Sequence, residues 1–179
     1  MGLFCFIILS VIMLIMTKKP NPIYVILDNI RSLYNVGAIF RTSDAANIAK
    51  IYICGMTGSP DSQLQIQRIN KTALGAEQTV PWQYYRNPVR IINKLKKEGV
   101  KIYALENTLH ATRYTNWDYQ FPCALVLGHE VRGVSQKVLK LADKVISIPM
   151  YGQKESLNVE AAYAVAVYEI LKQCKRTVL

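Results

Sequence analysis

From Pro22 onward, short uninterrupted apolar segments alternate with longer segments in which apolar residues recur at helical spacing. The apolar segments have the length of buried strands, which we predict over residues 23–27, 50–54, 101–105, 123–127 and 145–149. The periodic segments predict helices over residues 36–46, 88–98, 136–142 and 158–173. Strands that are apolar throughout are buried on both faces and are typical of parallel sheets. The pattern therefore predicts an α/β fold, with a mostly parallel sheet and helices on both of its faces.

Polar and conformationally special residues mark the boundaries of the predicted elements. Asn87 and Pro88 are a favourable helix start, with an N-cap candidate before a proline at the first helical position, and Gly99 ends this helix. We interpret residues 61–76 as a polar loop that leads into a short helix, and residues 107–120 as irregular and aromatic. No internal repeat interrupts the pattern, and the chain length suits one globular domain.

The beginning of the chain differs in composition from the rest. Residues 1–16 are apolar almost throughout, but the segment is shorter than the ~20 residues of a membrane span and lacks the features of a secretion signal. We predict an apolar extension over residues 1–16 and a folded domain over residues 17–179. We hypothesise that translation begins at Met16 and that residues 1–15 are dispensable. We expect a cytoplasmic protein; a membrane tether, with the lysines after the extension on the cytoplasmic side, is the weaker alternative.

Basic residues outnumber acidic residues by 22 to 12, which gives a net charge of +10. Such a surplus favours a polyanionic partner, because each neutralised phosphate releases condensed counterions. The surplus is concentrated in one stretch, opposed only by Glu98, whose basic residues are Arg86, Arg90, Lys94, Lys96, Lys97 and Lys101. We interpret this stretch as a candidate phosphate-binding surface; a solvated helix face is the alternative.

The cysteines and histidines do not form a metal-binding pattern. The four cysteines are widely separated and form no C-x-x-C pair, and the chain has only two histidines. We therefore predict no metal. Cys54 and Cys123 lie in predicted strands, where they are interpreted as small buried apolar residues. Nothing in this arrangement requires an oxidising compartment.

Three loops that follow predicted strands are rich in glycine and polar residues, over residues 28–37, 128–133 and 150–158. Ligands of open parallel sheets bind beyond the carboxyl ends of the strands, so these loops are the candidate ligand site. None of them contains a Walker A sequence or a G-x-G-x-x-G sequence after a strand. The usual phosphate and dinucleotide cradles are therefore not indicated.

These loops carry a family resemblance. The sequence LDNIRSLYNVGAIFRT, from Leu27 to Thr42, closely resembles the first motif of the SpoU/TrmH family of SPOUT RNA methyltransferases. The sequence LVLGHEVRGV, residues 125–134, resembles the second motif. The sequence IPMYG at residues 148–152, followed by ESLNV at residues 155–159, resembles the third. The three motifs occur in the family order, and the resemblance extends over roughly residues 22 to 173.

The resemblance implies an enzyme that transfers a methyl group from S-adenosyl-L-methionine to a ribose 2′-hydroxyl of tRNA or rRNA. It also implies a SPOUT domain over residues 17–179, with a deep trefoil knot near the C-terminus that holds the cofactor, and a homodimer as the working form. The basic surface of this domain would then bind the RNA, since no separate RNA-binding domain precedes Pro22. The alternative from another functional class is a non-catalytic RNA-binding protein that retains the knotted fold.

The resemblance also assigns roles to individual residues. By position, the cofactor-binding residues are Leu127, Gly128, Ile148, Met150, Ser156 and Leu157. The catalytic residues are Arg41, Asn35, Glu130, Ser156 and Asn158. The family is described with the arginine activating the ribose hydroxyl, but a guanidinium has a pKa above ~12 and rarely loses its proton. We therefore interpret Arg41 as a clamp for the adjacent phosphate and a stabiliser of the developing alkoxide, with the base as the alternative.

Two of these residues also have a structural interpretation as helix caps. Asn35 fits the N-cap of a helix that begins at Val36, and Asn158 fits the N-cap of the last helix. Glu160, two positions later, departs from the family, in which a small residue is more usual there.

Other site residues have equally simple alternatives. Glu130 and Arg41 fit an ordinary ion pair, and Gly128 and Gly133 fit turns of any function. His129 is interpreted as incidental. Capping and catalysis are compatible in one residue, so these alternatives do not exclude the implied roles.

Overall fold

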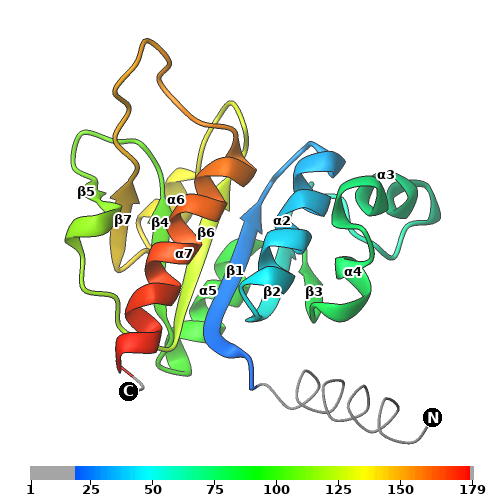
Figure 1. Cartoon of the computed structure of the whole chain (residues 1–179), viewed down its shortest axis with the longest axis horizontal. Coiled ribbons are helices and arrows are strands. Elements are labelled where there is room, and N and C mark those ends of the chain that lie inside the picture. The colour runs from blue at the N-terminus through cyan, green and yellow to red at the C-terminus, as the bar shows by residue number, and fades with distance from the viewer. Residues whose placement is uncertain (1–18, 178–179) are drawn as a thin grey trace, which may run out of the picture.

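The structure is a computed structural model that describes residues 19–177, so the predictions for residues 1–16 lie outside it. The described strands form one seven-stranded sheet in the order β3-β2-β1-β6-β4-β7-β5, and neighbouring strands pair in parallel. Helices cover both faces of this sheet (Figure 1), which confirms the predicted α/β fold. The trefoil knot stays a prediction, because strand order and pairing do not define how the chain passes through its own loops.

The strands are β1 (Asn21–Asp28), β2 (Ile48–Cys54), β3 (Trp82–Tyr85), β4 (Lys101–Leu105), β5 (Thr112–Arg113), β6 (Cys123–Gly128) and β7 (Lys144–Ser147). The helices are α2 (Leu33–Ala45), α3 (Gln63–Ala73), α4 (Ala76–Thr79), α5 (Pro88–Lys97), α6 (Gln136–Leu139) and α7 (Val159–Thr177), with a 3-10 turn η1 (Tyr114–Asn116). β1 pairs with β2 on one side and with β6 on the other, so the strand order reverses between β1 and β6. Such a reversal point is where ligands bind in open parallel sheets.

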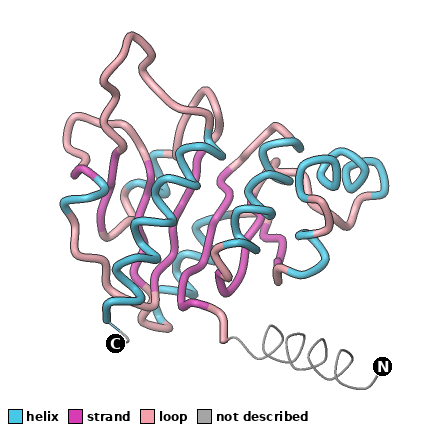
Figure 2. The backbone as a smooth tube through the Cα atoms, in the orientation of Figure 1, coloured by secondary structure: helices cyan, strands magenta, loops and turns pink. Residues whose placement is uncertain are grey.

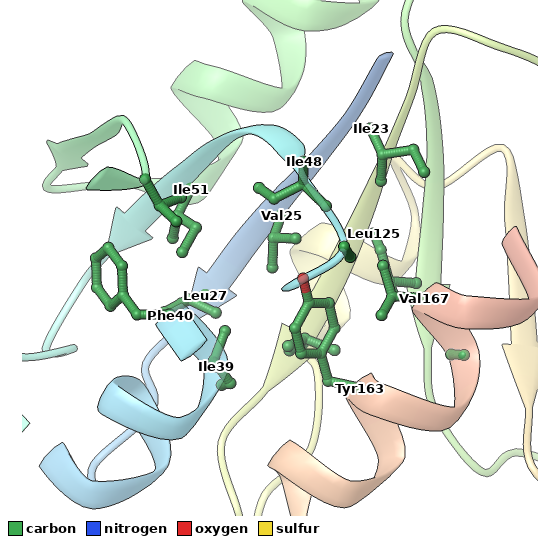
Figure 3. Close-up of a cluster of buried hydrophobic side chains, with 14 of the residues drawn as sticks. Ile23, Val25, Leu27, Ile39, Phe40, Ile48, Ile51, Leu125, Tyr163 and Val167 are labelled. Carbon is green, nitrogen blue, oxygen red and sulfur yellow. The ribbon is translucent and has the colours of Figure 1, made fainter. Parts of the chain in front are cut away.

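Alternate residues of the central strands face opposite layers of helices. On one face, Val25 and Leu27 of β1 and Leu125 of β6 pack with buried residues of α2 and α7 (Figure 3). On the other face, Ile26 and Val126 belong to a second cluster that includes apolar residues of α5 and α6. Because both faces of the central strands are covered, residues 23–27 of β1 and 123–127 of β6 form uninterrupted apolar segments.

Helix α2 begins earlier than the sequence suggested. The N-cap is Ser32, whose hydroxyl accepts a hydrogen bond from the backbone nitrogen of Asn35 at 3.3 Å. Asn35 therefore lies in the first turn, and the interpretation of Asn35 as the N-cap of a helix from Val36 is wrong. The physical reason is that Ser32 has the extended backbone of a cap, while its successors already have helical hydrogen bonding.

Helix α5 confirms its predicted start. The side chain of Asn87 accepts a hydrogen bond from the backbone nitrogen of Val89 at 3.0 Å, and Pro88 is the first helical residue. Gly99 follows the helix with a φ of 79°, in the left-handed region that glycine adopts without steric cost.

Residues 61–76 are mainly helical, so the predicted polar loop is wrong, whereas the short helix predicted to follow it is present as α4. Helix α3 occupies most of this segment and buries Ile69 and Ala73. It packs closely on α2: a Cβ at Gly37 would lie 2.1 Å from the carbonyl oxygen of Ile69. Helix α3 is stabilised by its contact with α2, and the polar sequence of α3 alone does not predict this stabilisation. The sequence also did not indicate the strands β3 and β5.

The long loops lie at one edge of the sheet. Figure 2 shows the loops that follow β6 and β7 projecting together beyond the carboxyl ends of the strands. The interpretation of Cys54 and Cys123 is confirmed, since both are buried, and burial raises the pKa of the Cys54 thiol to about 12. Within residues 19–177, no helix combines the length and the apolar character needed to cross a membrane.

Candidate active site

A cavity lies where the loops after β4, β6 and β7 meet the start of α7. Its lining includes every residue that the resemblance assigns to the cofactor: Leu127, Gly128, Ile148, Met150, Ser156 and Leu157. Glu130 lines the same cavity. Segments as far apart in the chain as Leu105 and Ala162 therefore form one concave surface beside the reversal point of the sheet.

Glu130 connects the loop after β6 to the loop after β1. Its carboxylate accepts hydrogen bonds from the backbone nitrogens of Arg31 at 3.0 Å and Ser32 at 2.9 Å, and from Nδ2 of Asn35 at 3.0 Å. Burial raises the pKa of Glu130, but these hydrogen bonds outweigh it and hold the pKa below the ordinary value of 4.5. Glu130 is therefore ionised at neutral pH and orients Asn35.

Asn35 also contacts the third motif. Its Oδ1 accepts a hydrogen bond from Nδ2 of Asn158 at 3.2 Å, while Oδ1 of Asn158 accepts one from the backbone nitrogen of Glu160 at 2.9 Å. The second bond is an N-cap interaction for α7, so the structural interpretation of Asn158 is confirmed. A single chain of polar contacts thus joins the predicted residues Glu130, Asn35 and Asn158.

The unusual Glu160 has a local partner. Oγ1 of Thr42, in α2, donates a hydrogen bond to Oε1 of Glu160 at 2.8 Å. The acidic residue lies in the first turn of α7, where it interacts favourably with the helix dipole. The departure from the family pattern therefore adds a contact between α2 and α7 and leaves the Asn35–Asn158 contact in place.

Arg41 lies apart from this set of contacts. It is exposed on α2, does not line the cavity, and its side chain forms no hydrogen bond or ion pair with residues 19–177. The interpretation of Arg41 and Glu130 as an ion pair is wrong, because the Glu130 carboxylate is held by Arg31, Ser32 and Asn35. Four of the predicted catalytic residues lie together within a single chain: Asn35, Glu130, Ser156 and Asn158. The guanidinium of Arg41 does not join them and is free for another partner.

The model of the SpoU rRNA Methylase family matches residues 22–168. The chain belongs to this family. The family match covers the sheet except for Asn21 and continues into α7 as far as Tyr168, so it includes every predicted site residue.

Relatives of known function agree with this assignment. The chain is 32% identical over 160 residues to the tRNA (guanosine(18)-2′-O)-methyltransferase of Aquifex aeolicus, covering 89% of this chain and 73% of the relative. It is 33% identical over 166 residues to the 23S rRNA (guanosine-2′-O-)-methyltransferase of Haemophilus influenzae, covering 89% of this chain and 63% of the relative.

Solved structures agree as well. The TrmH/SpoU tRNA modifying enzyme of Aquifex aeolicus superposes with a TM-score of 0.82 at 29% identity, covering 94% of this chain and 83% of that one. The AdoMet-bound rRNA methyltransferase of Sinorhizobium meliloti gives a TM-score of 0.76 at 27% identity, covering 90% and 58%. The expected class, an RNA ribose 2′-O-methyltransferase that uses S-adenosylmethionine, is confirmed for this SpoU-family chain.

The chemistry of the cavity fits this cofactor. Leucine and isoleucine side chains at positions 127, 148 and 157 offer apolar surfaces for a flat base, and Ser156 offers a hydroxyl. The loop after β6 is tightly folded here, since a Cβ on Gly128 would lie 2.2 Å from the carbonyl carbon of Gly133. Gly133 has a φ of 67°, which confirms its interpretation as a turn glycine. Gly128 is the last residue of β6, so its interpretation as a turn glycine is wrong.

Sequence reasoning missed Glu106 in this SpoU-family site. Glu106 directly follows β4, lines the cavity, and accepts a hydrogen bond from the backbone nitrogen of Val134 at 2.6 Å. The available signal was its position, because a polar residue directly after a predicted buried strand lies at the ligand-binding edge of the sheet. It lies outside the three motifs, which is why the resemblance did not identify it.

Proposed function

We propose that this protein methylates the 2′-hydroxyl of a guanosine in tRNA or rRNA. The observation that carries the proposal is the chain of contacts from Glu130, which lines the cavity, through Asn35 to Asn158. Guanosine is supported by the two relatives named above, one acting on tRNA and one on 23S rRNA.

Some residues of the site bind the cofactor, and others orient the ribose that receives the methyl group. The apolar side chains of Leu127, Ile148 and Leu157 hold the adenine of S-adenosylmethionine, and Ser156 supplies a hydroxyl beside it. When bound, this cofactor supplies a methyl group already activated by its sulfonium. The remaining requirement is to align the ribose oxygen, which is a task of positioning rather than of strong base catalysis.

We assign Arg41 the role of a clamp. Its side chain has no partner among residues 19–177, and a guanidinium keeps its charge at any physiological pH. Its planar set of donors suits a phosphate oxygen and the negative charge that develops on the ribose oxygen. Asn35 and Asn158, fixed by Glu130 and by the start of α7, position the nucleotide.

We also propose that the working form is a homodimer in which Arg41 serves the cavity of the partner subunit. Arg41 does not line the cavity of its own chain, so an intact site requires either a rearrangement or a second copy. The adjoining helices α2 and α7 carry exposed apolar side chains, Tyr34, Val165 and Tyr168, which favour burial against a partner.

A cytoplasmic location is proposed with this function. The support is the nature of the RNA substrates together with the cysteines, since Cys54, Cys123 and Cys174 are unpaired thiols. Fractionation of cells that express the full chain tests it, and recovery of the protein with membranes would contradict it.

The activity is tested by incubating the purified protein with tritiated S-adenosylmethionine and total RNA from cells that lack its gene. We expect label in RNA, and mapping of 2′-O-methyl groups is expected to locate it at a guanosine of tRNA or rRNA. Calorimetric titration with S-adenosylmethionine measures cofactor binding separately. Labelling of a base instead of a ribose, or no labelling despite cofactor binding, would overturn the proposal.

A further inference from the structure

A second hollow lies at the same edge of the sheet, beyond the ends of β1, β2 and β3. Its volume is about 940 Å³, within the ~300–1,000 Å³ typical of ligand sites. The residues that define it are Asn29, Gly55, Tyr84, Arg86, Arg90 and Lys137. We call it the Arg86 groove. It shares no lining residue with the cofactor cavity.

The Arg86 groove is strongly basic. Arg86, Arg90 and Lys137 are exposed, and none of their side chains forms an ion pair or hydrogen bond with another described residue. The one acidic residue of its lining, Asp28, is buried and accepts hydrogen bonds from Nδ2 of Asn29 at 2.7 Å and the backbone nitrogen of Ser135 at 3.1 Å. Three uncompensated cations around one occupied carboxylate favour an anionic ligand.

Two of the remaining basic residues of the same stretch, Lys94 and Lys96, differ in this respect. Lys96 forms an ion pair with Asp143 at 3.0 Å, and Lys94 lies 4.0 Å from Glu98. The structure thus divides the basic stretch seen in the sequence. Arg86 and Arg90 line the groove at the start of α5, whereas Lys94 and Lys96 have acidic partners nearer its end.

The Arg86 groove is connected to the active site. A hollow lined by Arg31, Met56, His129 and Arg132 adjoins the cofactor cavity, since His129 lines both. On the other side, the backbone nitrogen of Met56 donates a hydrogen bond to Oδ1 of Asn29 at 2.9 Å, and Asn29 lines the groove. Arg31 and Arg132 are exposed, so the connection adds two further cations.

The groove also presents an anchored aromatic ring. Tyr84 is 43% exposed, and its hydroxyl donates a hydrogen bond to the carbonyl oxygen of Gly55 at 2.7 Å. A ring that is both fixed and accessible is suited to stacking with a nucleobase, because every base has an apolar face. Cations along a groove and an exposed aromatic ring together are the features of single-stranded nucleic-acid sites.

We propose that the Arg86 groove binds a single-stranded segment of the substrate RNA next to the methylated nucleotide. The phosphates run from the active site past Arg31 and Arg132 to Arg86, Arg90 and Lys137, and one base stacks on Tyr84. This inference rests on the proposed function for the identity of the polyanion. It adds the path of the RNA on the protein and the preference for an unpaired segment.

The test measures binding of a fluorescein-labelled 12-nucleotide mixed-sequence RNA to the full chain by anisotropy, over a series of salt concentrations. The variant Arg86→Ala/Arg90→Ala removes two groove cations, and Lys97→Ala/Lys101→Ala is the matched control, with the same loss of charge from exposed residues outside the groove. Tyr84→Ala removes the ring, while Tyr84→Phe keeps it. Melting temperature and calorimetric affinity for S-adenosylmethionine verify that each variant is folded.

We expect the Arg86→Ala/Arg90→Ala variant to lose affinity by at least about fivefold and the salt slope to fall by about 1.4, at ~0.7 for each lost phosphate contact. Tyr84→Ala is expected to lose at least about fivefold, and Tyr84→Phe less than about twofold. Equal losses in the groove and control variants would overturn the inference. The same titrations are made with a 12-base-pair duplex RNA, and a loss of affinity for the duplex without a loss for the single strand would also overturn the inference. If the expected binding results are obtained but no methyl group is transferred, the proposed function is refuted, while RNA binding in the Arg86 groove is supported.

Discussion

At the scale of single residues, Glu130 is the side chain on which the geometry of the site depends. It is the acceptor for two backbone nitrogens and for Asn35, and through Asn35 it reaches Asn158. A carboxylate suits this position because both of its oxygens accept hydrogen bonds. An amide has one accepting oxygen, and its NH2 group would face a donor.

The variant Glu130→Gln is therefore expected to have a lower melting temperature than the wild type at about pH 7. The folded-state pKa of Glu130 lies below 4.5, so its stabilisation is complete above that value and is lost as the pH falls through the folded-state pKa. The difference in melting temperature between the two proteins should shrink between about pH 5 and pH 3. Thermal unfolding followed by circular dichroism checks this, and a constant difference across the range would contradict it.

Arg41 is the residue whose geometry matters more than its charge. The variant Arg41→Lys keeps the positive charge but loses the planar set of donors, so we expect methyl transfer to fall by about 10²–10³-fold. Single-turnover transfer from tritiated S-adenosylmethionine measures the rate, and calorimetry should give an unchanged cofactor affinity. Near-wild-type turnover would exclude the clamp role.

At the scale of elements, the contact between α2 and α7 positions two of the three motifs. Tyr163 of α7 is fully buried, and its hydroxyl forms a hydrogen bond with the Ser43 hydroxyl of α2 at 2.7 Å. Burial raises the pKa of Tyr163, so the phenol is neutral. The buried pair fixes the spacing between the helix that carries Asn35 and the helix that Asn158 caps.

Removal of either partner should be costly. We expect Tyr163→Phe and Ser43→Ala each to destabilise the fold by about 1 kcal/mol or more, because each leaves a buried hydroxyl without its partner. The double variant should be destabilised by less than the sum, since the partners are in contact. Chemical denaturation of the four proteins gives the coupling energy, and strict additivity would show that the bond does not contribute.

The loop between β7 and α7 is the element expected to respond to the cofactor. Residues 151–157 are all exposed, and the cavity beside them measures about 190 Å³, less than the ~300 Å³ at the lower end of ligand sites. Cofactor binding should therefore move and order this loop.

Limited trypsin digestion tests this expectation at Lys154, which is exposed within the loop. Saturating S-adenosylmethionine is expected to slow cleavage after Lys154 by at least about fivefold, because proteolysis requires local opening. The variant Leu157→Asp, which places a charge in the cavity lining, should lose this protection. Equal cleavage rates with and without cofactor would refute the ordering of the loop.

At the scale of the whole molecule, the separation of Arg41 from the cavity predicts that active sites are shared between subunits. Mixing Arg41→Ala and Leu157→Asp proteins, each inactive alone, should restore activity. A mixed dimer then contains one intact site, and statistical mixing gives about a quarter of the wild-type number of sites. Activity after co-refolding and light scattering for the dimer check this. No recovery in a confirmed mixed dimer would assign Arg41 to its own chain.

Part of the fold was accessible from the sequence because it depends on local chemistry. The central strands are apolar on both faces, and Asn87, Pro88 and Gly99 mark the ends of α5 by their own backbone preferences. The polar helix α3 was not accessible, because its stability comes from α2. The close approach at Gly37 that permits this contact is a property of two distant segments.

The sequence by itself determined the parallel α/β fold and the residues of the three motifs, because apolar segments and polar loops are properties of short consecutive stretches of the chain. Tertiary structure alone decided that Glu130 holds Asn35 instead of Arg41, that Glu106 joins the cavity, and that Arg86 and Arg90 lie in a groove while Lys94 and Lys96 are paired. The physical reason is that hydrogen bonds and ion pairs act over a few ångströms. Their partners are therefore chosen by the packing of strands and helices, which brings together residues that are remote in the chain.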